Sequence, residues 1–167
     1  MAFVKRAPLL IAIVATVFFS ARAAAGQEVV YVVRHAERAD QTPDSALSTE
    51  GVGRAYRLAE MLKSAGITHV FTSDTRRALD TAAPLAKAAH LTPRQLPGAD
   101  TPGLVARIGD LGPRARVLVV GHSNTVPELL RALHVDTSIA IADDEYDNLF
   151  IVVPRNGAAP TLIRLKY

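Results

Sequence analysis

Short runs of consecutive apolar residues alternate along the chain with longer stretches in which apolar residues recur every three or four positions. The runs at 29–33, 70–72 and 117–120 are rich in β-branched residues and predict strands that are buried on both faces. The stretches that follow them predict amphipathic helices. Because strands alternate with helices, we expect an α/β fold: a three-layer sandwich with a mainly parallel central sheet and helices on both faces.

The predicted helices are defined by their apolar stripes and by the residues at their ends. Ser48 or Thr49 can cap the first helix, and Gly66 can end it. Ser73 is in position to cap the second helix, and Pro127 suits the first turn of the last one. The positions expected to be buried are Leu58, Met61, Leu62 and Ala65 in the first helix, Leu79, Ala82, Ala83 and Ala86 in the second, and Val126, Leu129, Leu130 and Leu133 in the last.

Four shorter segments complete the expected fold. Residues 93–97 predict a short extended piece, and residues 104–108 predict one or two helical turns. Residues 149–153 and 161–165 predict two closing strands. A chain of 167 residues is long enough for one domain with a sizeable core and too short for two.

The first 25 residues have the layout of a secretory signal peptide. Two basic residues, Lys5 and Arg6, precede an apolar run over 7–20, and small residues follow at 21–25. A membrane-spanning helix needs about 20 apolar residues, and this run is shorter. We therefore expect residues 1–25 to be a cleaved signal peptide and residues 26–167 to form the mature domain. A retained membrane anchor is the alternative.

The signal peptide changes the interpretation of the charge. The whole chain carries a net charge of +3, which by itself would favour a nucleic-acid partner. Three of its 19 basic residues lie in the signal peptide, and the remaining 16 equal the number of acidic residues. We therefore expect no nucleic-acid partner, and no stable membrane association after cleavage.

Cysteine is absent from the sequence. This excludes disulfides and metal sites built on thiolates. An exported domain of this composition must be stabilised by its core alone. We expect it to lie in the periplasm or outside the cell, in a source that is bacterial.

Polar and charged residues follow the ends of the predicted central strands. Arg34 and His35 follow the first strand, Arg77 lies near the start of the next helix, and His122 follows the third long strand. Open α/β sheets bind ligands beyond the carboxyl ends of their strands. Two guanidinium groups and the N–H groups at a helix start can hold a phosphate, while a neutral histidine beside them can act as a nucleophile.

Four segments, in the same order and at similar spacing, resemble the histidine phosphatase superfamily, also called phosphoglycerate mutase-like. They are Arg34-His35-Ala36-Glu37, Leu47-Ser48-Thr49-Glu50-Gly51, Thr72-Ser73-Asp74-Thr75-Arg76-Arg77-Ala78-Leu79-Asp80-Thr81 and Val119-Val120-Gly121-His122-Ser123-Asn124-Thr125. The resemblance implies that His35 is the phosphorylated nucleophile and that Arg34, Arg77 and His122 complete the phosphate pocket. It implies no metal and no organic cofactor.

The proton donor to the leaving oxygen is not fixed by the resemblance, because many relatives use a carboxylate between the second arginine and the second histidine. Asp100 is the candidate by position, but Asp110 lies in the same interval and Glu37 adjoins the nucleophile. Asp100 also stands beside a Thr-Pro-Gly sequence, where it can serve as a helix cap or turn residue. The acidic run at 143–147 can bind a cation or shape the mouth of the site, although a solvated loop is the simpler interpretation.

The expected function is hydrolysis of a small phosphorylated substrate, a phosphomonoester or phosphohistidine, through a phosphohistidine intermediate. A binding module that holds phosphate without turnover is the alternative. A phosphomutase is a third candidate, disfavoured because the interval between Arg77 and His122 is short.

Overall fold

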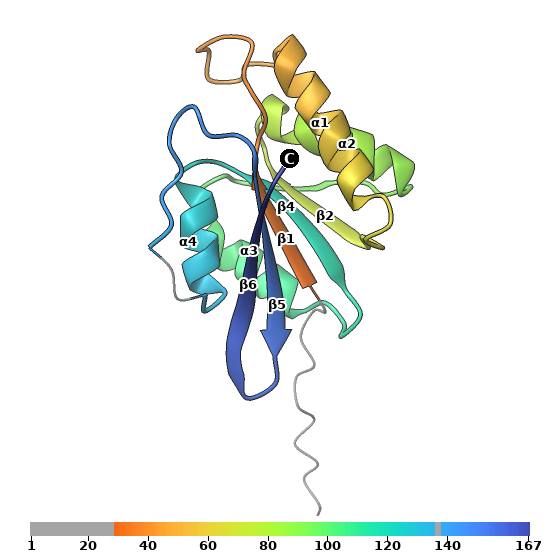
Figure 1. The fold of residues 1–167 in the computed structure, drawn as a ribbon, viewed down its shortest axis with the longest axis vertical. Coiled ribbons are helices and arrows are strands. Elements are labelled where there is room, and N and C mark those ends of the chain that lie inside the picture. The colour runs from red at the N-terminus through yellow and green to blue at the C-terminus, as the bar shows by residue number, and fades with distance from the viewer. Residues whose placement is uncertain (1–28, 136–137) are drawn as a thin grey trace, which may run out of the picture.

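The structure is a computed structural model and describes residues 29–135 and 138–167 (Figure 1). The predicted signal peptide lies outside the described residues. In chain order, the elements are β1 (Val29–Arg34), α1 (Thr49–Leu62), β2 (His69–Ser73), α2 (Arg76–Ala88), β3 (Arg94–Leu96), α3 (Thr101–Gly109), β4 (Arg116–Gly121), α4 (Thr125–Ala132), β5 (Asn148–Arg155) and β6 (Ala158–Lys166).

The strands form one six-stranded sheet in the order β3-β2-β4-β1-β5-β6. The first four strands in this order are parallel, whereas β5 pairs antiparallel with β1, and β6 pairs antiparallel with β5. The carboxyl ends of the parallel strands therefore meet at one edge, which is the edge where a ligand site is expected.

Side chains of the central strands alternate between two apolar clusters, one on each face of the sheet. Val33 and Leu118 pack with α1 and α2, while Val32 and Val119 pack on the opposite face with α3 and α4. The apolar runs predicted as strands are buried for this reason. The prediction of a mainly parallel sheet between two helical layers is confirmed.

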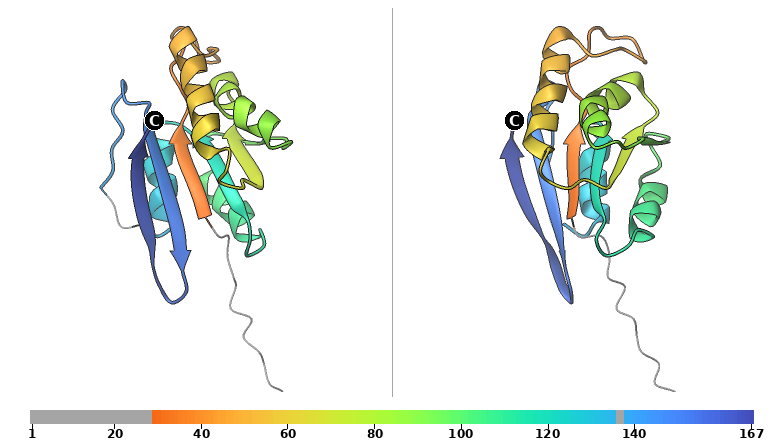
Figure 2. Two further views of the ribbon diagram at one scale, coloured as in Figure 1. Left: turned by 45° about the vertical axis from the view of Figure 1, so that its right-hand side comes forward. Right: turned by 90° about the vertical axis from the view of Figure 1, so that its right-hand side faces the viewer.

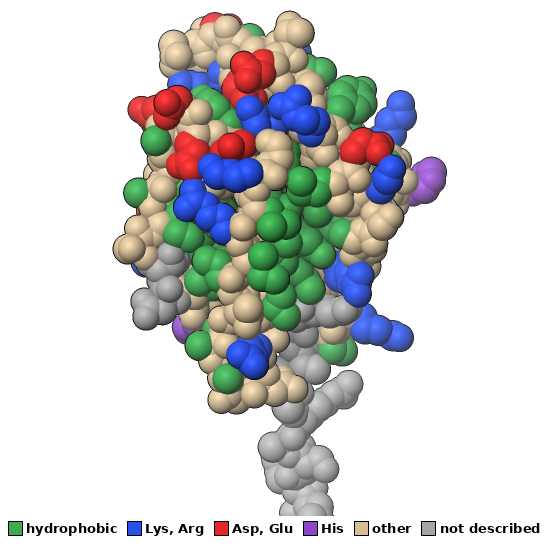
Figure 3. Space-filling view, viewed as in Figure 1, with side chains coloured by type: hydrophobic (Ala, Val, Ile, Leu, Met, Phe, Trp, Pro, Cys, Tyr) green, Lys and Arg blue, Asp and Glu red, His purple; other side chains and the backbone are tan. Residues whose placement is uncertain are grey.

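The β5–β6 hairpin forms one edge of the sheet, as the two turned views in Figure 2 show. Leu162 packs toward the cluster under α3 and α4. On the other face, Ile163 and Leu165 are 44% and 42% exposed, and apolar side chains gather below α1 (Figure 3). The hairpin is thus covered by helices less completely than the parallel strands are.

The first and last predicted helices agree closely with the structure. The Ser48 side chain caps α1 by accepting a hydrogen bond from the Gly51 N–H at 3.1 Å. Gly66 follows the helix with a φ of +65°. Met61, however, is 44% exposed, because the buried stripe of α1 runs through Ala55 and Ala59 instead. All four residues predicted to be buried in and after α4 are buried.

The second helix differs from its prediction. Ser73 does not cap it: Ser73 is the last residue of β2, and α2 begins at Arg76. The predicted stripe is also shifted, since Ala83 is exposed. The buried residues are Ala78, Thr81, Ala82, Leu85 and Ala86. A pattern of apolar residues misses this stripe because one of its positions is the polar Thr81.

None of the helices in the described part of the chain is both long enough and apolar enough to span a membrane.

Candidate active site

The two predicted histidines meet at the carboxyl ends of neighbouring strands. β1 and β4 pair in register from Val29 to Arg34, and the next backbone hydrogen bond joins the His35 N–H to the Gly121 carbonyl at 2.9 Å. This continuation of the ladder places His35 beside His122. The centroids of their rings are 5.2 Å apart, with an angle of 66° between the ring planes.

His35 is held in a fixed orientation and is only 4% exposed. Its Nδ1 lies 2.8 Å from the carbonyl oxygen of Ala36, which can only accept a hydrogen bond. Nδ1 therefore carries the proton, and the lone pair is on Nε2. The Ala36 N–H donates to the Thr81 hydroxyl at 2.9 Å, so that α2 fixes the residue after the histidine.

Arg34 and Arg77 each use part of the guanidinium to hold a loop. Nη1 of Arg34 donates to the carbonyl oxygens of Ala142 at 2.7 Å and Glu145 at 3.2 Å. Nη1 of Arg77 donates to the carbonyl oxygen of Pro43 at 2.6 Å. The Nε atoms of both arginines are buried and have no hydrogen-bond partner among the described residues. Buried donors of this kind are rare in folded proteins, so the pair indicates a place for an anion.

Ser73 is a site residue whose role the sequence did not reveal. Its hydroxyl lies 2.9 Å from Nε2 of His122 and 3.0 Å from the Thr75 hydroxyl. Nη2 of Arg77 lies 3.5 Å from Nδ1 of the same histidine. Both ring nitrogens of His122 are thus oriented by neighbours. Ser73 stands inside a recognised segment, but its orientation toward the histidine depends on the three-dimensional structure.

Both histidines are neutral at neutral pH. Burial lowers the pKa of His35 to about 3, and the charges of Arg77 and Arg34 act in the same direction. Burial lowers the pKa of His122 to about 4, again with the help of the two arginines. Burial also lowers the pKa values of Arg34 and Arg77 themselves, yet guanidinium groups remain charged. The site therefore combines cationic donors with an uncharged nitrogen nucleophile.

One open pocket brings the predicted residues together with several that were not predicted. It is lined by Arg34, His35, Arg38, Arg77, His122, Ser123, Asn124 and Asp143. Across residues 29–135 and 138–167, no three His, Asp or Glu side chains converge in a way that could hold a metal ion.

None of the three carboxylates considered as proton donors lines this pocket. Asp100 caps α3, accepting a hydrogen bond from the Gly103 N–H at 2.9 Å, and it borders a separate cavity next to Ser73. Asp110 is the C-terminal capping residue of the same helix. Glu37 pairs with Arg54, whose Nε lies 2.7 Å from Oε1. Burial alone would raise the pKa of Glu37, but the hydrogen bond and charge of Arg54 lower it.

The acidic run at 143–147 is not a freely solvated loop. Glu145 and Asp147 pair with Arg164 and Lys166 on β6. The hydrogen bond from Lys166 is the main reason that the pKa of Glu145 falls to about 2. The Tyr146 ring lies against Arg34, with its centroid 4.0 Å from the guanidinium carbon. Of the interpretations considered for the run, the structure favours shaping of the mouth.

Fold and site together define an α/β protein with an open cationic pocket around two neutral histidines, whose charge suits a phosphate group. The resemblance of the four segments to the histidine phosphatase superfamily is confirmed by a match to the sequence model of that superfamily. Residues 30–100 match the sequence model of branch 1 of that superfamily. This range holds Arg34, His35 and Arg77, while His122 lies beyond it.

Curated relatives match part of the chain. Over 66 residues it is 44% identical to the protein named "Probable phosphoglycerate mutase GpmB" of Proteus mirabilis (strain HI4320), a match that covers 35% of this chain and 31% of the relative. The protein of the same name from Yersinia pestis (strain Pestoides F) is 37% identical over 70 residues, with 38% and 33% covered. The match thus spans about a third of the length of these relatives.

Solved structures match nearly all of the described domain. The protein histidine phosphatase SixA in complex with tungstate superposes with a TM-score of 0.69 and 22% identity, covering 83% of this chain and 96% of SixA. The mycobacterial glucosyl-3-phosphoglycerate phosphatase in complex with inorganic phosphate gives a TM-score of 0.62 and 18% identity, covering 84% and 96%. At these identities the likeness shows a common fold.

Proposed function

We propose that the protein is a phosphohydrolase that transfers the phosphoryl group of a phosphomonoester or phosphohistidine to His35 and then to water. The observation that carries the proposal is the pair of buried, unpartnered Nε–H groups of Arg34 and Arg77 in the pocket that holds His35. The solved relatives named above, which are phosphatases crystallised with tungstate or phosphate, support it.

The geometry suggests how each residue acts. The Ala36 carbonyl holds the Nδ1 proton of His35, so the Nε2 lone pair attacks phosphorus as the bond to the leaving oxygen breaks. Arg34 and Arg77 donate hydrogen bonds to the transferring oxygens, whose charge they stabilise. Neutral His122, held between Ser73 and Arg77, lines the same pocket beside the nucleophile. Water then attacks phosphorus, and the electron pair of the P–N bond returns to Nε2.

The first experiment follows covalent transfer. Mature protein is mixed briefly with an aryl phosphate, and its intact mass and the released phosphate are measured. The wild type should show an acid-labile adduct of about 80 Da with turnover, and His35→Ala should show neither. His69→Ala is the matched control, because His69 lies at the opposite end of β2 from Ser73. Full activity of His35→Ala would overturn the proposal.

A binding module without turnover is the second candidate. It is favoured by one observation, namely that none of the three carboxylates predicted from the sequence as proton donors lines the pocket. Tight phosphate binding without an adduct and without turnover, across aryl and alkyl phosphates and phosphohistidine, would support it. The mutase name of the curated relatives carries less weight, since about two thirds of each relative lies outside the match.

We also propose that the domain acts outside the cytoplasm after cleavage near Ala23 to Ala25. The support is the order of basic, apolar and small residues in the first 25 positions. Intact-mass measurement of protein recovered from the periplasm or medium of a bacterial host would give the mature N-terminus. Protein that keeps residues 1–25 and sediments with membranes would indicate the retained anchor instead.

A further inference from the structure

We propose that Asp143 protonates the leaving oxygen and then activates the water that releases the phosphoryl group. The proposal rests on the proposed phosphohydrolase function. Of the described residues that line the pocket around His35, Asp143 is the one with a carboxylate, beside three arginines. A carboxylate here repels a phosphate dianion and weakens its binding. Its presence is explained if it takes part in the reaction.

Asp143 has no hydrogen-bond or ion-pair partner among the described residues, whereas several carboxylates near the site are engaged. Those that are engaged include Glu37 with Arg54, Asp100 with the Gly103 N–H, and Glu145 with Arg164 and Lys166. Within residues 29–135 and 138–167, Asp143 forms no hydrogen bond or ion pair, and its charge acts on Arg34 only from a distance. Its carboxyl group is therefore not engaged elsewhere in the described structure.

The loop that carries Asp143 is fastened to the phosphate-binding arginine. Nη1 of Arg34 donates to the carbonyl oxygens of Ala142 and Glu145, which lie on either side of Asp143 in the chain. Tyr146 packs on the same guanidinium. Arg34, which lines the pocket, thus also fixes the backbone around the acid. Positioning of this kind is what proton transfer requires.

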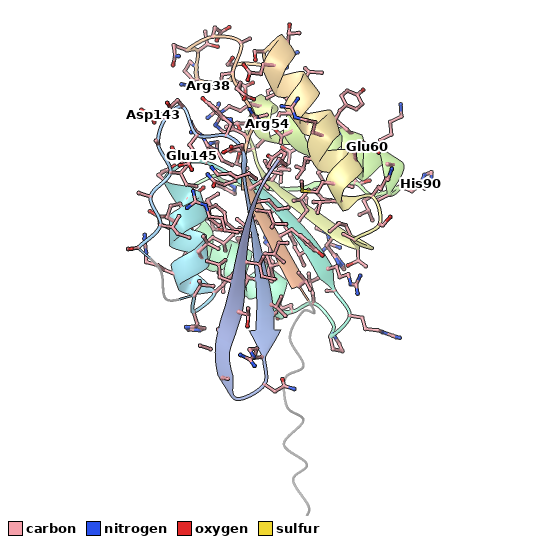
Figure 4. The ribbon with its side chains drawn as sticks, viewed as in Figure 1. Arg38, Arg54, Glu60, His90, Asp143 and Glu145 are labelled. Atoms are coloured by element: carbon pink, nitrogen blue, oxygen red, sulfur yellow. The ribbon has the colours of Figure 1, made fainter. Side chains whose placement is uncertain are left out.

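Asp143 lies nearer the mouth of the pocket than His35 does. His35 is buried, whereas Asp143 is exposed at the mouth, where it and Arg38 come from two different loops at the same end of the molecule (Figure 4). In phosphoryl transfer the attacking and leaving atoms are roughly in line. With Nε2 of His35 attacking from below, the leaving oxygen faces the mouth and Asp143.

The proton balance of the two steps is complete. In the first step the N–P bond forms, the bond from phosphorus to the leaving oxygen breaks, and that oxygen takes the proton of Asp143. In the second step the Asp143 carboxylate takes a proton from water while the water oxygen attacks phosphorus. The P–N bond breaks, its electron pair returns to His35, and Asp143 is protonated again.

The test compares Asp143→Asn with Asp144→Asn, a neighbouring exposed carboxylate that does not line the pocket. The kcat/KM values are measured on aryl phosphates from 4-nitrophenyl to phenyl phosphate. A good leaving group needs no proton, so Asp143→Asn should lose only a few-fold on the first but about 10²-fold on the second. It should also bind inorganic phosphate at least as tightly as the wild type. Asp144→Asn should behave as the wild type.

Three results would overturn the role of Asp143. One is an equal loss of activity on all substrates, and the second is no loss on any of them. The third is a wild type whose rates already fall with the leaving group as steeply as those of the variant. Failure of the proposed function itself is recognised separately, because it would appear as activity in His35→Ala on the same substrates.

Discussion

Arg76 and Arg77 are adjacent residues of the same type, and their environments differ because of helix geometry. Arg77 lies at the pocket with its Nε buried, while the side chain of Arg76 is 63% exposed and pairs loosely with Asp80 at 3.6 Å. Neighbouring positions on a helix point about 100° apart, so only one of the two can face the site. The resemblance to the superfamily pointed to Arg77 rather than Arg76, and the geometry of the first turn of α2 explains why Arg77 is the one at the pocket.

For activity, the ability of Arg77 to donate two hydrogen bonds from one planar guanidinium should be more important than its positive charge. Arg77→Lys keeps the charge but cannot offer Nε and Nη2 together, so we expect kcat/KM for an aryl phosphate to fall about 10- to 100-fold. Arg76→Lys should change kcat/KM by less than two- to three-fold. Steady-state kinetics and phosphate affinity on both variants check this. Equal effects at the two positions would contradict the assignment.

The helix α1 approaches the loop after His35 more closely than a residue with a Cβ atom at position 51 would allow. Gly51 lies in the first turn of α1, and a methyl group there would overlap the carbonyl oxygen of Glu37. The same carbonyl accepts a hydrogen bond from the Ser48 N–H at 2.9 Å. The close contact between the start of α1 and the Glu37 backbone therefore requires a glycine at position 51. The requirement is one of space, because the φ angle of Gly51 is ordinary.

Gly51→Ala should therefore lower both stability and activity. We expect the free energy of unfolding to fall by about 1–3 kcal/mol, because Ala at this position forces the helix and the loop apart. Gly53→Ala is the control: its nearest neighbour would be Nη1 of Arg57 at 3.6 Å, and it should gain about 0.5–1 kcal/mol from helix propensity. Urea unfolding of both variants, with kinetics, gives the answer. Similar changes at both positions would refute the contact.

At the scale of the whole molecule, Arg54 of α1 links the last residue of the chain, Tyr167, to the loop after β1. Arg54 donates to Glu37 and, at 2.9 Å, to the backbone oxygen of Tyr167. The Tyr167 N–H donates to the Asp147 carbonyl at 3.0 Å, and burial raises the pKa of its hydroxyl. The loop after β1, the helix α1 and the loop before β5 are therefore held together around the pocket.

The buried neutral histidines make stability depend on pH and on phosphate. Their pKa values of about 3 and 4 lie below the value near 6.5 expected in the unfolded chain, and burial lowers the pKa of His69 too. Between pH 6.5 and 4.5 the unfolded state binds more protons than the folded state, so the free energy of unfolding should decrease by about 4 kcal/mol for the two pocket histidines as the pH is lowered. Above pH 6.5 this contribution is constant.

Thermal unfolding at several pH values, with and without inorganic phosphate, checks this expectation. Phosphate favours the imidazolium form, so its presence should make the loss of stability toward acid smaller. The double variant His35→Gln, His122→Gln should show a flatter profile over the same range. A wild type whose melting temperature is unchanged from pH 7 to pH 4.5 would show that the histidines are accessible to protons in the folded state.

Much of the fold could be predicted from the sequence because its signals are local. Apolar runs marked the buried strands, and Ser48 and Gly66 marked the ends of α1. The stripe of α2 was wrong because Thr81 is buried through two hydrogen bonds, to the Ala36 N–H and the Arg77 carbonyl. The Ala36 N–H is 45 residues away in sequence, and a contact of this kind leaves no periodic signal.

The sequence by itself determined the α/β class, the resemblance to the histidine phosphatase superfamily, and the identity of His35, Arg34, Arg77 and His122 as the residues of the pocket. It could do so because strand ends in a parallel sheet meet at one edge, whatever the details of packing. Only the tertiary structure decided which groups complete the site, since burial and hydrogen bonding depend on contacts between distant segments. It placed Ser73 against His122, engaged Asp100 in a helix cap, and brought Asp143, more than 100 residues from the nucleophile, to the mouth of the pocket.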